Sequence, residues 1–254
     1  ATVESIPLIV ASIMSKKLAE GAVSLVLDVK VGSGAFMKNA TDAHQLARAM
    51  VDAGTRCGRR VTAFLTAMDR PLGSHIGNAL EIRESIELLA GRGPADSRSL
   101  ICRLGGEMLH LAGVADDLDD GEARIAASLD GGQAMQVFQS MVEAQGGDPA
   151  ITERPDALLA RAAVIEPLPA WRSGRIAHMD ALQIGLAAVR LGAGRNKADD
   201  RIDPSVGFVL HRKPGDVVEQ GEPLLDIHAA SHQDAEAISE RLKAAIELVE
   251  PGVT

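Results

Sequence analysis

Two polar side chains near the start of the chain have the spacing needed to bind a small polar ring. Ser12 and Lys16 lie four residues apart in a segment with helical apolar periodicity, so both side chains project from one face of a helix. A hydroxyl and an ammonium group on one face can hydrogen-bond a carbonyl oxygen and the imide edge of a small heterocycle. A solvated polar helix face explains the same spacing, and spacing alone favours that interpretation.

A glycine-rich segment has a second pattern that suits a ligand. Residues 30–37 read Lys-Val-Gly-Ser-Gly-Ala-Phe-Met and follow a predicted strand. Ligands bind at the carboxyl ends of strands in open α/β sheets, and glycine lets the backbone approach them closely. The alternative is a tight strand-to-helix connection. The segment is too short for a dinucleotide fingerprint, which needs a third glycine and a helix start.

Other polar groups are better explained without a ligand. Residues 192–197 (Gly-Ala-Gly-Arg-Asn-Lys) do not follow a strand and lack the Walker spacing, which favours a flexible loop over a phosphate cradle. The four Asp within 116–120 lack the glycine and terminal Glu of a calcium loop, which favours a solvated helix start. The seven His have no metal-ligand spacing, and they assemble no catalytic triad.

Composition excludes several classes of protein. The 254 residues carry a net charge of −9, which disfavours phosphate-driven nucleic-acid binding. Four Phe, one Trp and no Tyr leave few rings for stacking on single strands. The two cysteines, Cys57 and Cys102, are far apart and fit a reducing, cytoplasmic setting. No apolar run reaches the ~18 residues of a membrane helix. Charge, aromatic content and hydropathy together predict neither a nucleic-acid nor a membrane partner.

Alternating helical and strand patterns predict an α/β architecture in the first part of the chain. Ser5 is the expected cap of the first helix and Gly21 its stop, while Thr41 and Asn78 are the expected caps of two later helices. The expected elements are a helix at 5–20, a strand at 23–31, a helix at 41–58, a strand at 61–66 and a helix from 78 onward.

The second part of the chain changes character. Helices are expected across 98–145, broken near Gly113 and Gly131, and a cluster of prolines follows. After it we expect a strand at 173–177, a helix from Asp180 to Val189, β-hairpins between 206 and 228 with turns at 214–215 and 220–221, and a helix at 231–249. We therefore predict an α/β fold, with a mixed sheet flanked by helices and a C-terminal α+β domain. The predicted domains are a remnant helix of a helical domain at 1–20, a central α/β domain at 21–162 and the C-terminal domain at 163–254.

Several blocks of sequence resemble the thymidine phosphorylase and pyrimidine-nucleoside phosphorylase family. They lie at 5–21, 27–37 (Leu-Asp-Val-Lys-Val-Gly-Ser-Gly-Ala-Phe-Met), 65–73 (Leu-Thr-Ala-Met-Asp-Arg-Pro-Leu-Gly), 77–84 (Gly-Asn-Ala-Leu-Glu-Ile-Arg-Glu), 191–195 and 202–208. The resemblance begins within the family's pattern, so we expect a fragment. The part before Ala1 would hold most of the helical domain, the phosphate-binding loop and an Arg that clamps the base.

The resemblance implies a reaction and a set of binding residues. The family cleaves a pyrimidine nucleoside with phosphate, giving the free base and a (deoxy)ribose 1-phosphate; for thymidine these are thymine and 2-deoxyribose 1-phosphate. By matching position, Ser12 and Lys16 bind the base and stabilise its developing charge. Phe36 forms a wall of the pocket, with Ile9 and Ile13 nearby. No catalytic residue falls within these 254 residues, and we expect the fragment alone to be inactive.

The resemblance also implies a monovalent cation, such as potassium. Its expected ligands are the backbone carbonyls of Leu72 and His75 and the carboxylate of Glu84, which are hard oxygen donors. An exposed helix residue is the alternative interpretation of Glu84. Phosphate is the expected co-substrate, with no organic cofactor, and the full-length enzyme is expected to be a cytoplasmic homodimer. The sequence does not separate thymidine from broader pyrimidine specificity.

A different class of function is suggested by residues 205–228, which resemble a biotinyl/lipoyl-type half-barrel. A carrier or interaction module of that type needs a Lys at a hairpin tip, and the segment after Leu225 (Asp-Ile-His-Ala-Ala-Ser) contains none. The carrier hypothesis is therefore disfavoured. A related nucleotide phosphorylase or phosphoribosyltransferase stays open, because the phosphate loop that would separate these activities is not in the sequence.

Overall fold

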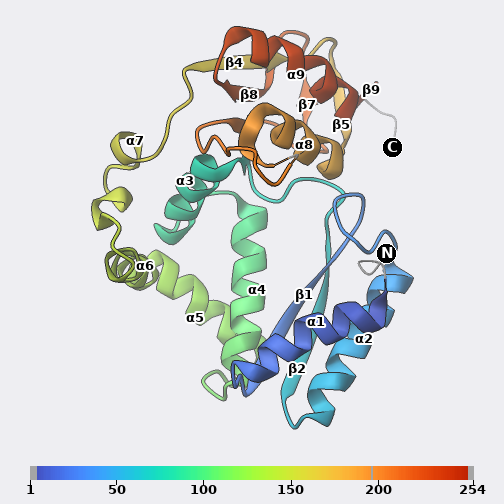
Figure 1. Ribbon diagram of the computed structural model, residues 1–254, viewed down its shortest axis with the longest axis vertical. Helices are drawn as coiled ribbons and strands as arrows, with labels where there is room; N and C mark the ends of the chain where they lie inside the picture. Colours follow the sequence, from blue (N-terminus) through green and yellow to red (C-terminus); the bar gives the residue numbers. More distant parts are fainter. Residues whose placement is uncertain (1–4, 196, 251–254) are drawn as a thin grey trace. The chain divides into compact units, whose positions relative to one another are not determined.

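The computed structural model describes residues 5–195 and 197–250 (Figure 1). Contacts between residues divide the chain into two compact units. The first unit comprises 1–69 and 98–128, and the second comprises 70–97 and 129–254. The predicted domain boundaries at residues 20 and 162 stay predictions. The first and last residues of the predicted domains, 1–4 and 251–254, lie outside the described part of the chain.

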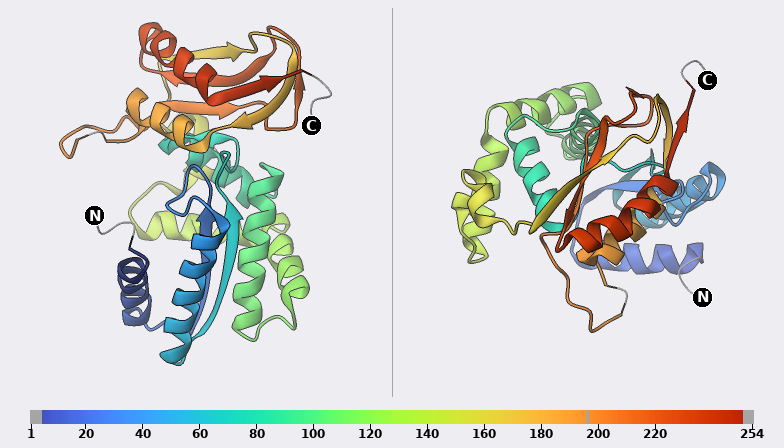
Figure 2. Two further views of the ribbon diagram at one scale, coloured as in Figure 1. Left: turned by 90° about the vertical axis from the view of Figure 1, so that its right-hand side faces the viewer. Right: turned by 90° about the horizontal axis from the view of Figure 1, so that it is seen from above.

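The first unit is built on a parallel pair of strands. Its main elements are α1 (Ile6–Ala19), β1 (Ser24–Val31), α2 (Ala40–Arg56), β2 (Arg60–Ala67), most of α4 (Ala95–Leu111) and most of α5 (Leu118–Asp130). β1 and β2 pair in parallel from Ser24↔Arg60 to Val31↔Ala67, with α2 as the crossover that a parallel pair requires. Figure 2 shows α2 and α4 on opposite sides of these strands.

Apolar side chains of α1, α2 and the two strands form the core of the first unit. Met14 is the buried residue of α1, and it packs in one cluster with Leu25, Val29, Leu46 and Met50. The opposite face of the strands meets α4 through polar contacts, among them a 2.6 Å hydrogen bond from Thr62 Oγ1 to Glu107. The strands are thus covered on both faces, as parallel strands require.

The start of α2 corrects one expectation. The N-cap is Asn39, whose side chain accepts a 2.9 Å hydrogen bond from the Asp42 amide. Thr41, the expected cap, lies inside the helix. Asn is at least as good a cap as Thr, and from its position two residues earlier it satisfies one amide of the first helical turn. The expected cap Asn78 is likewise the first residue of α3, and Gly77 precedes it at the cap position.

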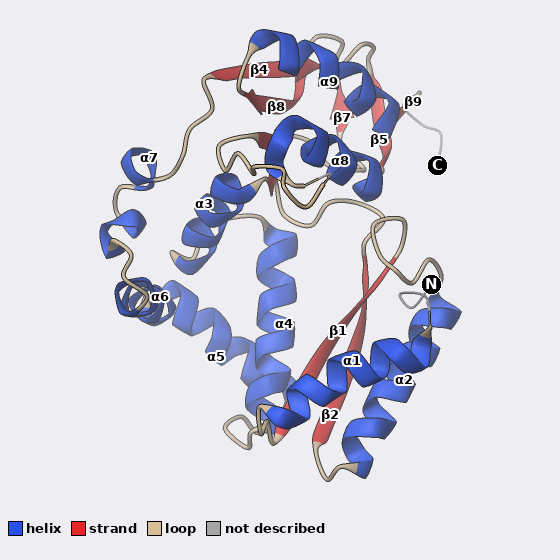
Figure 3. Cartoon of the chain, viewed as in Figure 1, coloured by secondary structure: helices blue, strands red, loops and turns tan. Residues whose placement is uncertain are grey.

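The second unit contains two antiparallel sheets (Figure 3). Their strand orders are β3-β6-β8-β4 and β7-β5-β9. The strands are β3 (His75–Ile76), β4 (Val164–Pro169), β5 (Gly174–Met179), β6 (Gly207–Leu210), β7 (Val217–Val218), β8 (Pro223–Ala229) and β9 (Ile246–Val249). The helices are α3 (Asn78–Leu89), α6 (Gln133–Ala144), η1 (Pro149–Thr152), α7 (Pro155–Leu158), α8 (Ala181–Ala188), the π-helical turn η2 (Val189–Ala193) and α9 (His232–Ala245).

Strand pairing in the second unit differs from the predicted hairpins. β6 pairs with β8, and β7, which lies between them in the sequence, pairs with β5 in the other sheet. The expected final helix ends at Ala245 and continues as β9, which pairs with β5. Ile246 and Leu248 are buried while Glu247 is exposed, so this segment has the two-residue alternation of a strand. The Asp180 cap is confirmed, since its side chain accepts from the amides of Leu182 and Gln183.

The α/β class is confirmed, with three small sheets in place of one mixed sheet among the described residues. Buried side chains from both antiparallel sheets and from α8 and α9, such as Phe208, Ile176, Ile184 and Leu242, form the core of the second unit. No helix in the described part of the chain combines the length and apolar character needed to span a bilayer.

Close helix packing in the first unit generates a stability prediction. A Cβ added to Gly121 of α5 would lie 2.3 Å from the carbonyl oxygen of Gly106 in α4. Gly121→Ala therefore forces α4 and α5 apart and should lower the free energy of unfolding by about 1–3 kcal/mol. Denaturant unfolding curves measure this change.

The matched control is Gly185→Ala in α8, where an added Cβ meets no atom within 4 Å. Alanine has the higher helix propensity, so this variant should be neutral or up to about 1 kcal/mol more stable. Equal effects of the two substitutions would contradict the close approach of α4 and α5.

Candidate functional site

Helix α1 exposes the predicted base-binding pair. Ser5 occupies its N-cap position and Pro7 lies in its first turn. Ile9 and Ile13 are partly buried and pack against the core of the first unit. Ser12 and Lys16 are exposed, so the helix turns isoleucines inward and presents a hydroxyl and an ammonium group outward.

The two adjacent lysines of α1 differ in their contacts. Lys17 forms a 3.0 Å ion pair with Glu20. The ammonium of Lys16 makes no hydrogen bond or ion pair with any residue that the structure describes. Its charge is therefore available to a ligand, which is a necessary property of a binding residue.

Phe36 lies in the loop that follows β1, on a different element from Ser12 and Lys16. The backbone around it is fixed by a 2.9 Å hydrogen bond from the Gly34 amide to the Met68 carbonyl. The Lys38 ammonium donates to the Ser33 carbonyl at 2.8 Å. Phe36 is nevertheless 74% exposed. An apolar ring held in solvent by an ordered loop suits contact with a ligand or with another part of a longer protein.

Gly32 allows this loop to turn back on β2. Its φ of 134° lies in the region that favours glycine, and an added Cβ would lie 2.3 Å from the Asp69 carboxylate. That carboxylate accepts a 3.2 Å hydrogen bond from the Ser33 amide. The glycine at position 32 is therefore required by the close approach of the loop to Asp69.

Lys30, in the same sequence block, is held within the protein. Its ammonium lies 2.6 Å from Asp28 and 2.9 Å from the hydroxyl of Thr66, and Thr66 donates to Asp28 at 2.5 Å. This network joins β1 to β2 near their carboxyl ends. Lys30 thus stabilises the strand ends and has no free charge for a ligand.

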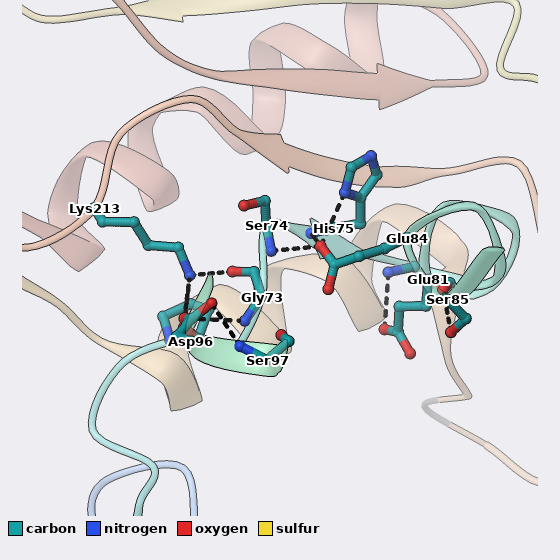
Figure 4. Close-up of polar contacts among 11 residues, drawn as sticks. Gly73, Ser74, His75, Glu81, Glu84, Ser85, Asp96, Ser97 and Lys213 are labelled. Atoms are coloured by element: carbon teal, nitrogen blue, oxygen red, sulfur yellow. Dashed lines mark hydrogen bonds and ion pairs between the residues drawn. The ribbon is translucent and has the colours of Figure 1, made fainter. Parts of the chain in front are cut away.

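The carboxylate of Glu84 is buried in the second unit and accepts hydrogen bonds from one loop (Figure 4). Its side chain is buried, and its Oε2 accepts from the amides of Ser74 at 2.6 Å and His75 at 2.9 Å. The Nδ1 atom of His75 lies 3.0 Å from the same oxygen. Burial raises the pKa of Glu84, but the hydrogen bonds from His75 and Ser74 outweigh burial and hold the pKa below its ordinary value. Glu84 is thus a buried loop anchor and not the exposed residue of the alternative interpretation.

The predicted cation ligands are brought together in part. His75 lies beside Glu84. Along an antiparallel strand, the backbone groups of successive residues point alternately toward and away from the neighbouring strand. The Ser74 carbonyl accepts a 2.7 Å hydrogen bond from the Leu210 amide, so the backbone groups of His75 point away from β6. Leu72 lies in the preceding loop with 39% of its surface exposed. The donors around Oε2 disfavour a cation at that oxygen, and no hydrogen bond reaches Oε1 within the described residues. A cation can therefore use Oε1 only, and the site stays a prediction.

A second polar cluster holds the same loop, and the sequence did not indicate it. The ammonium of Lys213 donates to the carbonyls of Gly73 and Pro71 and lies 3.0 Å from Asp96. Asp96 also accepts a 3.3 Å hydrogen bond from the Gly73 amide. Figure 4 shows Lys213 and Asp96 beside Gly73. Lys213 and Asp96 are 117 residues apart, and no local pattern links them.

Comparison with known proteins identifies the family. Residues 1–135 match the profile of the glycosyl transferase family a/b domain, and residues 175–249 match the pyrimidine nucleoside phosphorylase C-terminal domain. The chain belongs to the pyrimidine-nucleoside phosphorylase family. This confirms the resemblance found in the sequence.

Individual relatives in the pyrimidine-nucleoside phosphorylase family match nearly all of the chain. The pyrimidine-nucleoside phosphorylase of Staphylococcus haemolyticus is 44% identical over 97% of the chain and 57% of the relative. That of Bacillus subtilis is 46% identical over 94% of the chain and 55% of the relative. The chain thus spans little more than half the length of these relatives.

The Lys213–Asp96 pair generates a pH prediction. Burial raises the pKa of Asp96, but the Lys213 ammonium, helped by backbone amides, outweighs burial, so the pKa lies below its ordinary value. A carboxyl whose pKa is lowered by folding stabilises the folded state above its unfolded pKa, and this stability is lost as the pH falls through the folded pKa. At pH 7, Asp96→Asn should therefore be less stable than wild type by about 1 kcal/mol or less, because Asp96 is partly exposed to solvent.

The measurement is the free energy of unfolding from urea curves between neutral pH and about pH 3. The difference between wild type and Asp96→Asn should shrink as the pH falls. Asp52→Asn, an exposed change in α2, is the matched control and should change the free energy of unfolding by about 0.5 kcal/mol or less. A difference for Asp96→Asn that stays constant with pH would show that the carboxylate charge contributes nothing.

Proposed function

We propose that a full-length form of this protein, matched in length to its relatives, cleaves pyrimidine nucleosides with inorganic phosphate. The products are the free base and a pentose 1-phosphate, with thymidine as the proposed substrate. The observation that carries this proposal is the match of both parts of the chain, including the C-terminal domain specific to pyrimidine nucleoside phosphorylases. The relatives that match over the whole chain are named pyrimidine-nucleoside phosphorylase.

The chemistry explains why donors are needed at the base. A phosphate oxygen forms a bond to the anomeric carbon while the bond from that carbon to the ring nitrogen breaks. The bonding pair leaves with the base and spreads onto its carbonyl oxygens. Hydrogen-bond donors fixed where this charge develops lower the barrier. Ser12 and Lys16 supply a hydroxyl and an unpaired ammonium one helical turn apart, which suits that role.

Apolar residues would complete the base pocket. Phe36 is largely exposed. Ile9 and Ile13 pack against the core but keep part of their surface exposed, and this part is available to the base. A planar pyrimidine buries apolar area against such side chains, while Ser12 and Lys16 donate hydrogen bonds to the polar atoms at its edge. The proposed pocket therefore combines one aromatic wall, two aliphatic side chains and two donors.

The alternative activities are less well supported. The glycosyl transferase profile alone is compatible with a related nucleotide phosphorylase or a phosphoribosyltransferase, but the C-terminal match favours pyrimidine-nucleoside phosphorolysis. A carrier domain needs an accessible Lys at a hairpin tip. The lysine near the β6–β7 turn is Lys213, and its ammonium is bound to Asp96 and two carbonyls. We propose that the two antiparallel sheets form a biotinyl/lipoyl-like half-barrel with a structural role.

Lys16 provides the test of the proposed base site. In the full-length form, Lys16→Ala removes a charged hydrogen bond worth roughly 1.5–3 kcal/mol, so kcat/KM for thymidine should fall about 10- to 100-fold. Lys17→Ala is the matched control, because Lys17 lies on the same helix and pairs with Glu20; it should retain kcat/KM within about twofold. Equal losses in the two variants, or no loss in Lys16→Ala, would remove Lys16 from the site.

We further propose that a monovalent cation joins the carbonyls of Leu72 and His75 to Glu84. In the full-length form, potassium should raise the melting temperature relative to choline chloride of equal ionic strength, because an ion that binds only the folded state stabilises it. Glu84→Gln should abolish this increment. Glu87→Gln, on the same helix, should keep it, and an equal potassium response in Glu84→Gln and wild type would rule out the assignment.

A further inference from the structure

A small basic pocket in the second unit has no role in the proposed reaction. It has a volume of about 130 Å³ and lies among helix α3, the segment that leads from α7 into β4, and strand β8. Its polar lining consists of Arg83, Arg161, His228 and Asp156, and the remainder is mainly alanine, with Leu80 and Ile165. Two arginines, one histidine and one aspartate therefore line the same space.

The two arginines reach the pocket from different elements and have different partners. Arg83 projects from α3, and its Nη1 lies 2.9 Å from the carboxylate of Asp156. Arg161 precedes β4, and its guanidinium makes no ion pair or hydrogen bond with any residue in the described ranges. Two guanidinium groups beside one cavity repel each other unless an anion lies between them. The internal carboxylate compensates only one of the two charges.

Asp156 shows what Arg83 binds in the absence of a ligand. It belongs to the four-residue helix α7, and its side chain is 72% exposed, against 24% for Arg83. An exposed carboxylate contributes little to stability through such a pair and can be displaced by another oxyanion. The Asp156 carboxylate thus occupies a position where an anion can bind Arg83, and it would compete with a ligand anion for Arg83.

His228 provides a neutral donor at the back of the pocket. It lies in β8, opposite Ile165 of β4 and Gly207 of β6. Its neighbours along the strand, Ile227 and Ala229, are buried in the core. Because successive side chains of a strand point to opposite faces, the His228 ring points away from the core. Burial lowers the pKa of His228, and the positive charges of His75, Arg83 and Arg161 add to burial against the opposing effect of Asp226. The ring is therefore neutral at pH 7 and has one N–H group to donate.

We propose that this pocket binds a small tetrahedral oxyanion of the phosphate or sulfate class. Arg83 and Arg161 would each donate through the planar guanidinium fork that matches oxyanion geometry, and His228 would donate through its N–H group. The volume of about 130 Å³ matches inorganic phosphate or sulfate better than a nucleotide, whose base and sugar need several hundred Å³. None of these residues belongs to the base or cation sites proposed above, so the inference goes beyond the proposed function.

The test follows the imidazole resonances of His228 by NMR while inorganic phosphate is added to the 254-residue chain. Sodium chloride keeps the ionic strength constant, and His228→Gln assigns the resonances. Wild type should show a saturable shift. Arg83→Gln and Arg161→Gln should each weaken phosphate binding about tenfold or more, the usual effect of losing a charged hydrogen bond. Because binding is read at His228, phosphate held elsewhere does not produce the signal.

One substitution is expected to act in the opposite direction. Asp156→Asn removes the competing carboxylate and should tighten phosphate binding several-fold. Since Asp156 is 72% exposed, this variant should fold as wild type. Arg154→Gln is the matched control, because Arg154 is an exposed arginine just before α7 outside the pocket lining, and it should bind as wild type.

Sulfate and acetate separate the chemical classes of anion. Sulfate should compete with phosphate, and planar acetate should bind at least tenfold more weakly. The proposal is overturned if the His228 resonances do not respond saturably, if Arg83→Gln and Arg161→Gln bind as wild type, or if Asp156→Asn fails to tighten binding. Acetate binding as tight as phosphate would overturn the tetrahedral assignment. Because this readout contains no nucleoside, its failure leaves the proposed phosphorolysis standing.

Discussion

A buried carboxylate keeps its charge only where donors replace the water it has lost, and Glu84 meets this condition. Two amides and one imidazole nitrogen of the Ser74–His75 segment surround its Oε2 atom. These contacts fix the segment that becomes β3, and β3 forms the edge of the four-stranded sheet next to β6. Lys213, which follows β6, reaches back to the preceding residues Pro71 and Gly73. The loop before β3 is thereby held by Glu84 of α3 and by Lys213, which follows β6.

The contacts of the lysines show which of them are held within the protein. Lys17, Lys30 and Lys213 each have a carboxylate within about 3 Å, and two of them join separate elements of the fold. Lys16 has no such partner among the residues described, yet its neighbours on α1 are fixed by packing against the core. The unpaired ammonium of Lys16 is a property that the proposed base site requires. The proposed base site therefore rests on both the family relationship and the distribution of charge.

Local patterns predicted much of the fold. The helix ending before Gly21, the strand to Val31 and the Asp180 cap depend on neighbours in sequence, and the structure confirms them. Predictions that needed long-range information failed, since nothing in the sequence near β7 indicates that its partner is β5. The strand β9 follows directly on a helix, and only pairing with β5 reveals it. For the candidate site, helical spacing places Ser12 and Lys16 on one face, but only the family resemblance assigns this face to a ligand. Lys213 with Asp96, and Arg83 with Arg161, are far apart in sequence, and no local pattern links them.

The central proposal is that a full-length form of the protein transfers a pentose from a pyrimidine to phosphate. It is tested most directly by incubating the full-length form with thymidine and inorganic phosphate and quantifying all products. The account predicts thymine and 2-deoxyribose 1-phosphate in equal amounts, with no thymine released when phosphate is omitted. Thymine accompanied by free deoxyribose, or thymine release independent of phosphate, would contradict it.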